Sequence, residues 1–278
     1  MNYDGIHIRE LRTLEEMKAV ETMQRDVWGE ADLDVLPSPF LKLVTDTGGM
    51  LLGAYDGTAL VGFVFGILAR DADGLTIHSD MLAVSPAYRD RRLGYRMKLA
   101  QREWCLSRGI QRVSWTFDPL QARNARLNFG KLGAVCDQYK VDYYGETTSV
   151  LHQLGTDRFW LRWELTSKHV KQKIAGAITI LPGHYQAAQA LIRCDEKQNP
   201  IEQKIMLAPS IFIEIPGDIS ALQEADRALA VQWRTVTRQA FTDTFASGYQ
   251  VINFYPIERG VQRVGVYELQ RKALTNGK

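Results

Sequence analysis

The stretch HSDMLAVSPAYRDRRLGYR, from His78 to Arg96, decides the expected fold because the spacing of its apolar residues changes partway along it. The residues up to Val84 are typical of a β-strand, and Pro86 marks a turn. From Arg89 to Arg108 the apolar residues recur at helical spacing, and Gly109 stands where a helix C-cap is expected. The stretch therefore predicts a strand that runs through a short turn into a helix.

The start of this helix has the features of an anion-binding site. Backbone N–H groups at a helix N-terminus have no intrahelical partner, and the helix dipole places partial positive charge there. Arg89, Arg91 and Arg92 add full positive charges at the same place, which suits a phosphate or pyrophosphate group. An ordinary basic, solvent-facing helix start fits these residues equally well, so residue chemistry alone leaves both interpretations open.

Apolar runs on both sides of the stretch predict a mixed sheet. Before it we expect a strand, two helices and an antiparallel hairpin: Ile6–Leu11, Leu14–Trp28, Phe40–Val44, Met50–Tyr55 and Ala59–Leu68. After it we expect a strand, a helix and two further strands: Val113–Phe117, Asp118–Leu132, Ala134–Tyr144 and Arg158–Leu165. Strands joined through helices after a run of hairpins imply a parallel pair inside a mostly antiparallel sheet.

The last part of the chain predicts a second group of elements. We expect strands at Ile211–Ile215, Tyr249–Tyr255 and Val264–Leu269, and a long helix at Ser220–Phe245. The order strand, helix, glycine, strand repeats that of Ile77–Phe117, so a degenerate second copy of the same half-fold is one interpretation. A small α/β appendage that extends the sheet is the other.

Composition and charge exclude several classes of protein. The chain is 45% hydrophobic and 24% charged with a formal net charge of +2, which is typical of a soluble globular protein. This charge gives no field that would favour nucleic acid or an anionic membrane, so we expect neither partner. Cys105, Cys136 and Cys194 lie far apart without metal-like spacing, and the N-terminal residues show no signal pattern. We therefore expect a reduced, cytoplasmic protein that uses no metal.

The residues around the predicted helix start resemble the acyl-CoA signature of the GNAT superfamily of N-acyltransferases. Arg89–Gly94 falls in the frame Gln/Arg-x-x-Gly-x-Gly/Ala, and Val84–Tyr88 resembles the turn that precedes it. Asn124-Ala125 and Lys131–Ala134 resemble the next helix of the family and its end, and Trp115–Ala134 as a whole resembles a subgroup known only as predicted acetyltransferases.

The resemblance extends to about residue 150 of the chain. It implies an α/β (α+β) fold of the GNAT type, in which helices flank a mixed, mostly antiparallel sheet. It also implies two parts: a GNAT acyltransferase domain at residues 1–150 and a C-terminal α/β extension at residues 151–278.

The resemblance further implies how an acyl-CoA co-substrate would bind. The strand at Leu82–Val84 would pair with the pantetheine arm, and backbone N–H groups from Arg91 to Tyr95 would hold the pyrophosphate. The donor would be acetyl-CoA or another acyl-CoA such as succinyl-CoA. The residues assigned to it are Leu82, Ala83, Val84, Arg89, Arg91, Arg92, Leu93, Gly94, Tyr95 and Asn124.

Two residues depart from the family pattern. Arg92 stands where the signature has its first glycine, so its side chain either obstructs the close approach of the phosphates or binds a phosphate itself. Phe129 stands where the family often has a tyrosine that protonates the departing thiolate, and a phenyl ring has no proton to donate.

Attack of an amine on a thioester needs a base, and we assign this role to His78 together with Asp80. Counting by twos along the strand places both residues on one face with Leu82 and Val84. The resemblance supports His78, because several family members carry a carboxylate base at the matching position. Asp80 either orients His78 or acts as the base itself. A purely structural histidine within the strand is the alternative.

The acceptor side of the expected site is assigned to Trp115, Asp118, Tyr143 and Tyr144. Asp118 follows a strand, where sites gather in open α/β sheets, but the favoured alternative is an N-cap of the next helix. Tyr143 and Tyr144 either line a pocket or alternate across a sheet edge.

Together these residues predict an acyl-CoA-dependent N-acyltransferase that acts on the primary amine of a small molecule or amino acid. The transfer would proceed by direct attack in a ternary complex. A GNAT fold that binds CoA or a small molecule without turnover is the first alternative, and a structural protein without a CoA site is the second. The acceptor, the acyl group and a homo-oligomeric state stay open.

Overall fold

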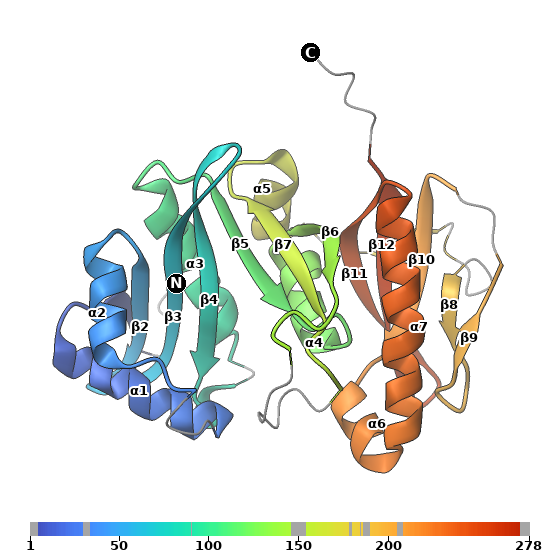
Figure 1. Cartoon of the computed structure of the whole chain (residues 1–278), viewed down its shortest axis with the longest axis horizontal. Helices are drawn as coiled ribbons and strands as arrows, with labels where there is room; N and C mark the ends of the chain where they lie inside the picture. The colour runs from blue at the N-terminus through green and yellow to red at the C-terminus, as the bar shows by residue number, and fades with distance from the viewer. Residues whose placement is uncertain are drawn as a thin grey trace. The chain divides into compact units, whose positions relative to one another are not determined.

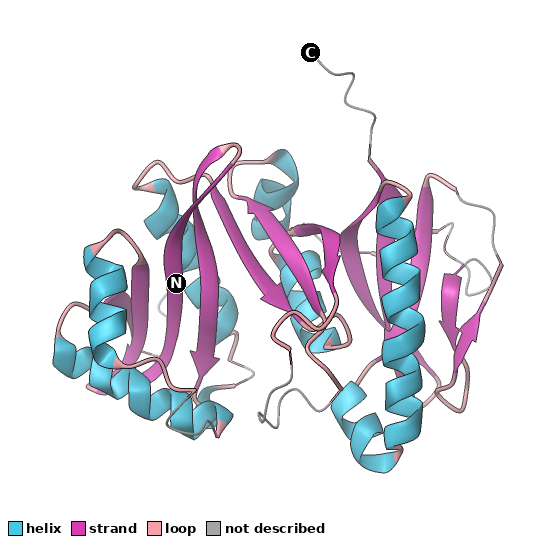
Figure 2. Ribbon diagram, in the orientation of Figure 1, coloured by secondary structure: helices cyan, strands magenta, loops and turns pink. Residues whose placement is uncertain are grey.

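The structure is a computed structural model that describes residues 5–29, 34–89, 91–145, 154–177, 180–183, 185, 190–204 and 208–272. The chain divides into two compact units, Met1–Trp115 with Glu164–Thr166, and Thr116–Trp163 with Ser167–Lys278. Each unit is described by itself, and both are mixtures of helix and strand (Figure 2). The expected domain boundary at residue 150 stays a prediction.

The first unit is a mixed sheet with helices on both faces (Figure 1). Its strands follow the order β1-β2-β3-β4-β5, antiparallel from β1 to β4 and parallel between β4 and β5. The elements are β1 (Ile6–Glu10), α1 (Leu14–Trp28), α2 (Ser38–Asp46), β2 (Met50–Asp56), β3 (Ala59–Asp71), β4 (Gly74–Val84), η1 (Pro86–Tyr88), α3 (Leu93–Leu106) and β5 (Arg112–Phe117), whose last residues belong to the second unit. The mostly antiparallel sheet with one parallel pair is confirmed.

Two apolar clusters hold the first unit together, one on each face of the sheet. On one face, residues of α1 and α2 such as Met17 and Leu41 pack against Phe63 and Phe65 of β3. On the other face, Leu93 and Met97 of α3 pack against residues of β1, β2 and β3. The crossover helix α3 therefore lies on one side of the sheet, and α1 and α2 lie on the opposite side.

A β-bulge interrupts β4 at Asp80. Strand β3 pairs Gly66 with Ser79 and Phe65 with Met81, so Asp80 is an extra residue on its strand. A bulge breaks the alternation of side chains between the two faces, and the prediction that Leu82 shares a face with His78 and Asp80 is therefore wrong.

The faces of the residues around the bulge follow from their contacts. Ser79 accepts a hydrogen bond from Lys98 of α3, so its neighbour His78 lies on the opposite face. Leu82 and Val84 pack into the cluster on the α3 face, opposite His78. The prediction that Val84 shares a face with His78 is therefore wrong as well.

The second unit contains a second run of paired strands in the order β7-β6-β11-β12-β10-β8-β9. The pairs are antiparallel except β8 with β10. The elements are α4 (Ala122–Ala125), the π-helix η2 (Arg126–Lys131), β6 (Val135–Lys140), β7 (Arg158–Glu164), α5 (Lys168–Ile174), β8 (Ala190–Cys194), β9 (Pro200–Glu202), β10 (Ser210–Pro216), α6 (Ile219–Ala225), α7 (Arg227–Ala246), β11 (Tyr249–Arg259) and β12 (Gln262–Arg271).

Two predicted helices of the second unit are divided in the structure. The expected helix Ser220–Phe245 is split into α6 and α7, because Asp226 leaves helical geometry and its side chain caps α7 by accepting from the N–H of Leu229. The expected helix Asp118–Leu132 is the short α4 followed by a π-helix. A π-helix widens the turn to i→i+5 bonding, as in the bond from the N–H of Leu132 to the carbonyl of Leu127.

The predicted repeat of the half-fold is matched in element order but not in strand pairing. In the first unit β4 and β5 are direct neighbours, whereas β12 lies between β10 and β11 in the second. The degenerate second copy thus stays a hypothesis that rests on element order alone.

An aromatic cluster forms the core of the second unit. The ring of Phe159 on β7 makes edge contacts with Phe241 of α7 and Tyr267 of β12, with centroids 4.7 and 5.7 Å apart. Helix α7 runs in front of the strands in Figure 1 and supplies Phe241 to this cluster. None of the helices in the described part of the chain is long and apolar enough to cross a membrane.

Candidate functional site

The N-terminus of α3 is open in the part of the chain that the structure describes, because the residue at its N-cap position does not cap it. Arg92 occupies the N-cap position, and its side chain makes no capping hydrogen bond. Its backbone has φ 58° and ψ 18°, the left-handed conformation that glycine adopts without strain. The residue that replaces the first glycine of the signature thus keeps the backbone conformation of a glycine, although its Cβ makes that conformation unfavourable.

Exposed cations surround the open helix start. Arg89, Arg91 and Arg92 are all exposed to solvent, while the neighbouring Asp90 lies outside the described residues. The guanidinium of Arg91 lies over the ring of Tyr88, 5.2 Å from its centroid. Tyr88 in turn donates a hydrogen bond to Asp56 at the end of β2 over 2.7 Å, which fixes the turn. Uncapped N–H groups beside three cations fit a phosphate-bearing ligand.

The other residues assigned to acyl-CoA line the strand and helix that meet at this turn. Leu82 and Val84 are half-buried beside α3, and a Cβ at Gly94 would lie 3.8 Å from the Leu82 side chain. Leu93 is buried in the core and Ala83 faces the α1 and α2 side, so only their backbones could meet a ligand. Tyr95 is half-buried, and this burial raises the pKa of its hydroxyl.

His78 is positioned by the one parallel strand pair of the first unit. β4 pairs Ile77 with Val113 and His78 with Ser114, and His78 Nδ1 lies 3.0 Å from Ser114 Oγ. Burial and the positive charge of Lys98 lower the pKa of the half-buried imidazole. The ring is therefore neutral near pH 7, which is the form that accepts a proton.

Asp80, the bulged residue, projects from the same strand into solvent. It is exposed as a side chain, yet the protein around it partly desolvates the carboxylate and raises its pKa. A bulge commonly re-aims a side chain next to a functional site. The structure therefore gives β4 two titratable side chains whose pKa values have moved toward each other.

Lys98 on α3 is a functional candidate that the sequence patterns did not single out. Its side chain is only 3% exposed, and Nζ donates to Ser79 Oγ over 2.9 Å and to Gln101 Oε1 over 3.0 Å. Nζ also lies 4.1 Å from the centroid of Trp115, a buried residue that was assigned to the acceptor. The sequence offered one signal for this residue: a lysine stands three residues before Gln101 on the buried side of the helix.

The comparisons with known proteins agree with this geometry. Residues 14–133 match the model of the acetyltransferase (GNAT) family. This segment is a GNAT acetyltransferase domain. It contains β4, the turn and all of α3, and it extends into the second unit as far as the end of the π-helix.

Three solved structures are similar to parts of the chain. They are the ribosomal-protein-S18-alanine N-acetyltransferase from Escherichia coli, an acetyltransferase of the GNAT family from Streptococcus pneumoniae, and the paia N-acetyltransferase from Thermoplasma acidophilum in complex with coenzyme A. In that order, their identities are 13%, 16% and 15% and their TM-scores 0.46, 0.45 and 0.39. The matches cover 65%, 56% and 57% of this chain and 99%, 97% and 98% of the others. No curated protein matches the chain.

The remaining predicted residues lie in the second unit. Asp118 is not an N-cap: Gln121 precedes α4, and the Asp118 carboxylate instead accepts from the N–H of Leu120 and pairs with Arg234 over 2.6 Å. Tyr143 and Tyr144 are exposed and make an edge contact with each other, with centroids 4.8 Å apart. Whether they or Asp118 contact an acceptor stays a prediction.

The two residues of the second unit that bear on CoA differ in exposure. Asn124 of α4 is exposed, which leaves it accessible to a ligand. Phe129 in the π-helix is fully buried, and its ring contacts Phe117 and Tyr267 with centroids 5.9 and 5.8 Å apart. Phe129 therefore serves the aromatic core of its unit.

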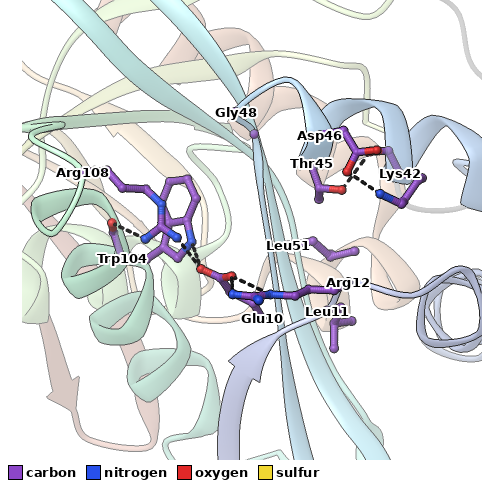
Figure 3. A pocket seen from close by; sticks show the side chains of 11 residues that line it. Glu10, Leu11, Arg12, Lys42, Thr45, Asp46, Gly48, Leu51, Trp104 and Arg108 are labelled. Carbon is purple, nitrogen blue, oxygen red and sulfur yellow. Dashed lines mark hydrogen bonds and ion pairs between the residues drawn. The ribbon is translucent and has the colours of Figure 1, made fainter.

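A hollow of about 390 Å³ lies elsewhere in the GNAT domain (Figure 3). Its charged side chains are already paired: Glu10 accepts from Trp104 Nε1 over 2.7 Å and pairs with Arg12 and Arg108, and Lys42 pairs with Asp46. None of the residues assigned to acyl-CoA or to the base is among the described residues that line this hollow. These pairs account for the charged side chains around the hollow, so no ligand is needed to explain them.

Proposed function

We propose that the chain is an acyl-CoA-dependent N-acyltransferase that moves an acetyl, or a larger acyl group such as succinyl, to a primary amine. The acceptor that we propose is a small molecule or an amino acid. The amine attacks the thioester directly, with both substrates bound at once. Cys105, Cys136 and Cys194 are buried and free, which fits this direct route and the cytoplasmic location that we expect.

One observation carries this proposal: a bulged strand with a neutral histidine leads directly into an uncapped helix start. The helix start is shaped for the phosphates of CoA, because its N–H groups face no side-chain cap and Arg89, Arg91 and Arg92 surround it. The strand supplies His78, whose lowered pKa keeps it ready to accept a proton. Anion binding and base chemistry thus meet within one strand–turn–helix segment of the GNAT domain.

The chemistry requires the acceptor to lose a proton as its nitrogen bonds to the thioester carbon. His78 takes that proton, directly or through a water, because it is the neutral imidazole on β4. Ser114 Oγ lies 3.0 Å from Nδ1 of His78 and helps to orient the ring. The carbonyl oxygen of the thioester would be polarised by a backbone N–H near Val84. Asp80, at the bulge, would orient His78 or act as the base itself.

The first experiment is a thermal melt with and without acetyl-CoA, succinyl-CoA and free CoA. A ligand at about 100 times its Kd stabilises the folded state by about 2.7 kcal/mol, which for a chain of this size raises Tm by several degrees. The thioester with the larger shift then enters a screen of amines in which released thiol is measured. No shift with any of them at millimolar concentration would contradict the proposal.

A non-catalytic CoA-binding protein is the second candidate, and Phe129 favours it. The buried phenyl ring leaves the domain without the tyrosine that often protonates the leaving thiolate in the family. The two candidates separate on turnover: a binding protein gives the thermal shift but releases no thiol with any amine.

A further inference from the structure

Strands β4 and β5 part immediately after their last paired residues. The parallel ladder joins Ile77 to Val113 and His78 to Ser114, and among the described residues no later pair joins the two strands. β4 continues to Val84 paired with β3 alone, and the next residues on the two separating strands are Ser79 and Trp115. The ladder between β4 and β5 therefore ends at these residues, and we call the unpaired stretch beyond it the opening between the two strands.

Lys98 occupies the closed end of this opening on the α3 side. Its Nζ bonds to Ser79 on one strand and lies over the ring of Trp115 on the other. Nζ also donates to the side-chain oxygen of Gln101, whose own Nε2 is buried without a partner. No carboxylate pairs with Lys98 among the described residues, although a buried ammonium normally requires one. A buried lysine kept without a counter-charge indicates a function beyond packing.

We propose that Lys98 donates the proton that the departing CoA thiolate takes up, an inference that rests on the proposed acyltransferase function. An acyl-CoA held by its phosphates at the start of α3, with its arm along Val84 to Leu82, extends toward Ser79 and the closed end of the opening. Lys98 is the proton donor that the GNAT domain places there, and it compensates for the missing hydroxyl at Phe129.

The nitrogen of the amine bonds to the carbonyl carbon, and His78 takes one proton from that nitrogen. The bond between carbon and sulfur breaks, the electron pair stays on sulfur, and the Lys98 ammonium transfers one proton to it. The products are an amide and a free thiol. The proton on His78 leaves to solvent, and the neutral Lys98 amine regains one from solvent.

The environment of Lys98 suits a proton donor that works near neutral pH. Burial lowers the pKa of Lys98 to about 7, so the amine gains and loses a proton in the range where the enzyme operates. The ionisable groups that act on it are His78 on β4 and the Cys105 thiol on its own helix; burial raises the pKa of that thiol to about 12, so it stays neutral. An acid must be protonated to act, so kcat is expected to fall as the pH rises through the Lys98 pKa.

The test compares wild type with Lys98→Met and Lys98→Gln, each as the full chain. Methionine matches the length of lysine and removes the buried amine, so this variant is expected to fold, and glutamine is the second variant in case it does not. Lys18→Met on the exposed face of α1 is the matched control. In both Lys98 variants kcat should fall about 10- to 100-fold, KM for acetyl-CoA should change less than about threefold, and the fall at alkaline pH should vanish. The control should match wild type.

A second measurement needs no turnover. Free CoA is bound to each protein, and the pKa of its thiol is read from the ultraviolet absorbance of the thiolate between pH 5 and 9. Desulfo-CoA provides the blank. Beside the Lys98 ammonium the bound thiol should ionise at a lower pH than the thiol of free CoA in the same buffer, and in Lys98→Met its pKa should return to that of free CoA or rise above it.

The outcomes separate the two proposals. A wild-type protein that neither binds CoA nor releases thiol from any acyl-CoA overturns the proposed function, and the role of Lys98 with it. A wild type that turns over, beside Lys98 variants with unchanged kcat and an unchanged thiol pKa, overturns the role of Lys98 alone. A lower kcat together with a restored thiol pKa confirms that Lys98 is the proton donor.

Discussion

The segment from β4 to α3 and the segment from β10 to α7 share the order strand, turn, helix, yet only the first ends in a helix start that could hold an anion. In the second unit Asp218 caps α6 and Asp226 caps α7, each accepting a backbone N–H of the first turn over 3.0 Å. In the first unit Arg92 stands at the cap of α3 and bonds to none of them. A capping carboxylate satisfies the N–H groups and repels anions, so the segment in the second unit is closed to phosphate.

Strands β10 and β4 also differ in how their titratable side chains are paired. Glu214 of β10 is fully buried, and it is held by Arg259 over 2.8 Å and by the N–H of Cys194 over 2.8 Å. The imidazole of His78 on β4 instead has Nδ1 3.0 Å from the neutral hydroxyl of Ser114. Element order is thus shared between the two segments, while Glu214 on β10 is paired with a cation and His78 on β4 contacts a neutral hydroxyl.

Removal of the base from β4 should give the largest effect. His78→Gln keeps an amide that can bond to Ser114 but loses the titratable ring, so kcat is expected to fall by about 10²–10⁴. Because the imidazole must be neutral and its pKa is lowered, the wild-type rate should rise with pH below the ordinary histidine range, before the fall at higher pH that is expected from Lys98, and this acidic rise should be lost in His78→Gln. Steady-state rates across pH check the activity, and calorimetry should show acetyl-CoA affinity within about threefold of wild type.

The control for that variant is in the second unit. Glu214→Gln removes a charge from the Arg259 pair, so it should lower Tm while kcat per folded molecule stays at the wild-type value. Full turnover in both His78→Gln and the double variant with Asp80→Asn would show that the base has been assigned wrongly.

Conversion of the open helix start into a capped one should give the next largest effect. Arg92→Asp replaces a cation with the residue type that caps α6 and α7, so the affinity for acetyl-CoA should fall about 100-fold through charge reversal and competition for N–H groups. Calorimetry at two salt concentrations measures it, since an electrostatic loss shrinks as salt rises. An affinity equal to that of wild type would place the phosphates away from α3.

The reverse change in the second unit should affect stability alone. Asp226→Ala leaves the N–H of Leu229 without its side-chain partner, which costs about 1 kcal/mol and lowers Tm by about 2–4 °C. Acetyl-CoA should bind as tightly as it does to wild type. A loss of CoA affinity in this variant would mean that the second unit takes part in phosphate binding, and the contrast between the two helix starts would fail.

Much of the fold could be predicted because local patterns decide it. The helix Leu14–Trp28 was predicted with its observed bounds, since Thr13 and Glu16 form a capping box and Gly29 ends the helix in the left-handed conformation. The hairpin at Asp56-Gly57 and the strand to Val84 were placed within a few residues. The break at Asp226 was missed because apolar spacing continues across it, and only the cap geometry shows that a new helix begins.

The site was harder to predict because its details depend on contacts between distant parts of the chain. The bulge at Asp80 arises from pairing with Phe65 and Gly66 of β3, which no pattern within β4 contains. Lys98 becomes unusual only when α3 lies on the sheet and buries the amine between Ser79 and Trp115. The sequence showed that Phe129 lacks the hydroxyl of the family tyrosine, but only the structure shows that its ring belongs to an aromatic core.

The smallest expected effect concerns the strain at Arg92. Arg92→Gly relieves the left-handed backbone conformation, which costs a residue with a Cβ about 1–2 kcal/mol. About 0.5–1 kcal/mol of this gain is offset, because glycine makes the unfolded chain more flexible. We expect a net stabilisation of about 0.5–1 kcal/mol, or about 1–3 °C in Tm, measured without ligand. The same melt with acetyl-CoA then decides what the guanidinium does. If Arg92 binds a phosphate, the ligand-induced shift should shrink in the glycine variant; if the side chain obstructs the phosphates, the shift should grow. An unchanged Tm without ligand would mean that the backbone at Arg92 is not strained.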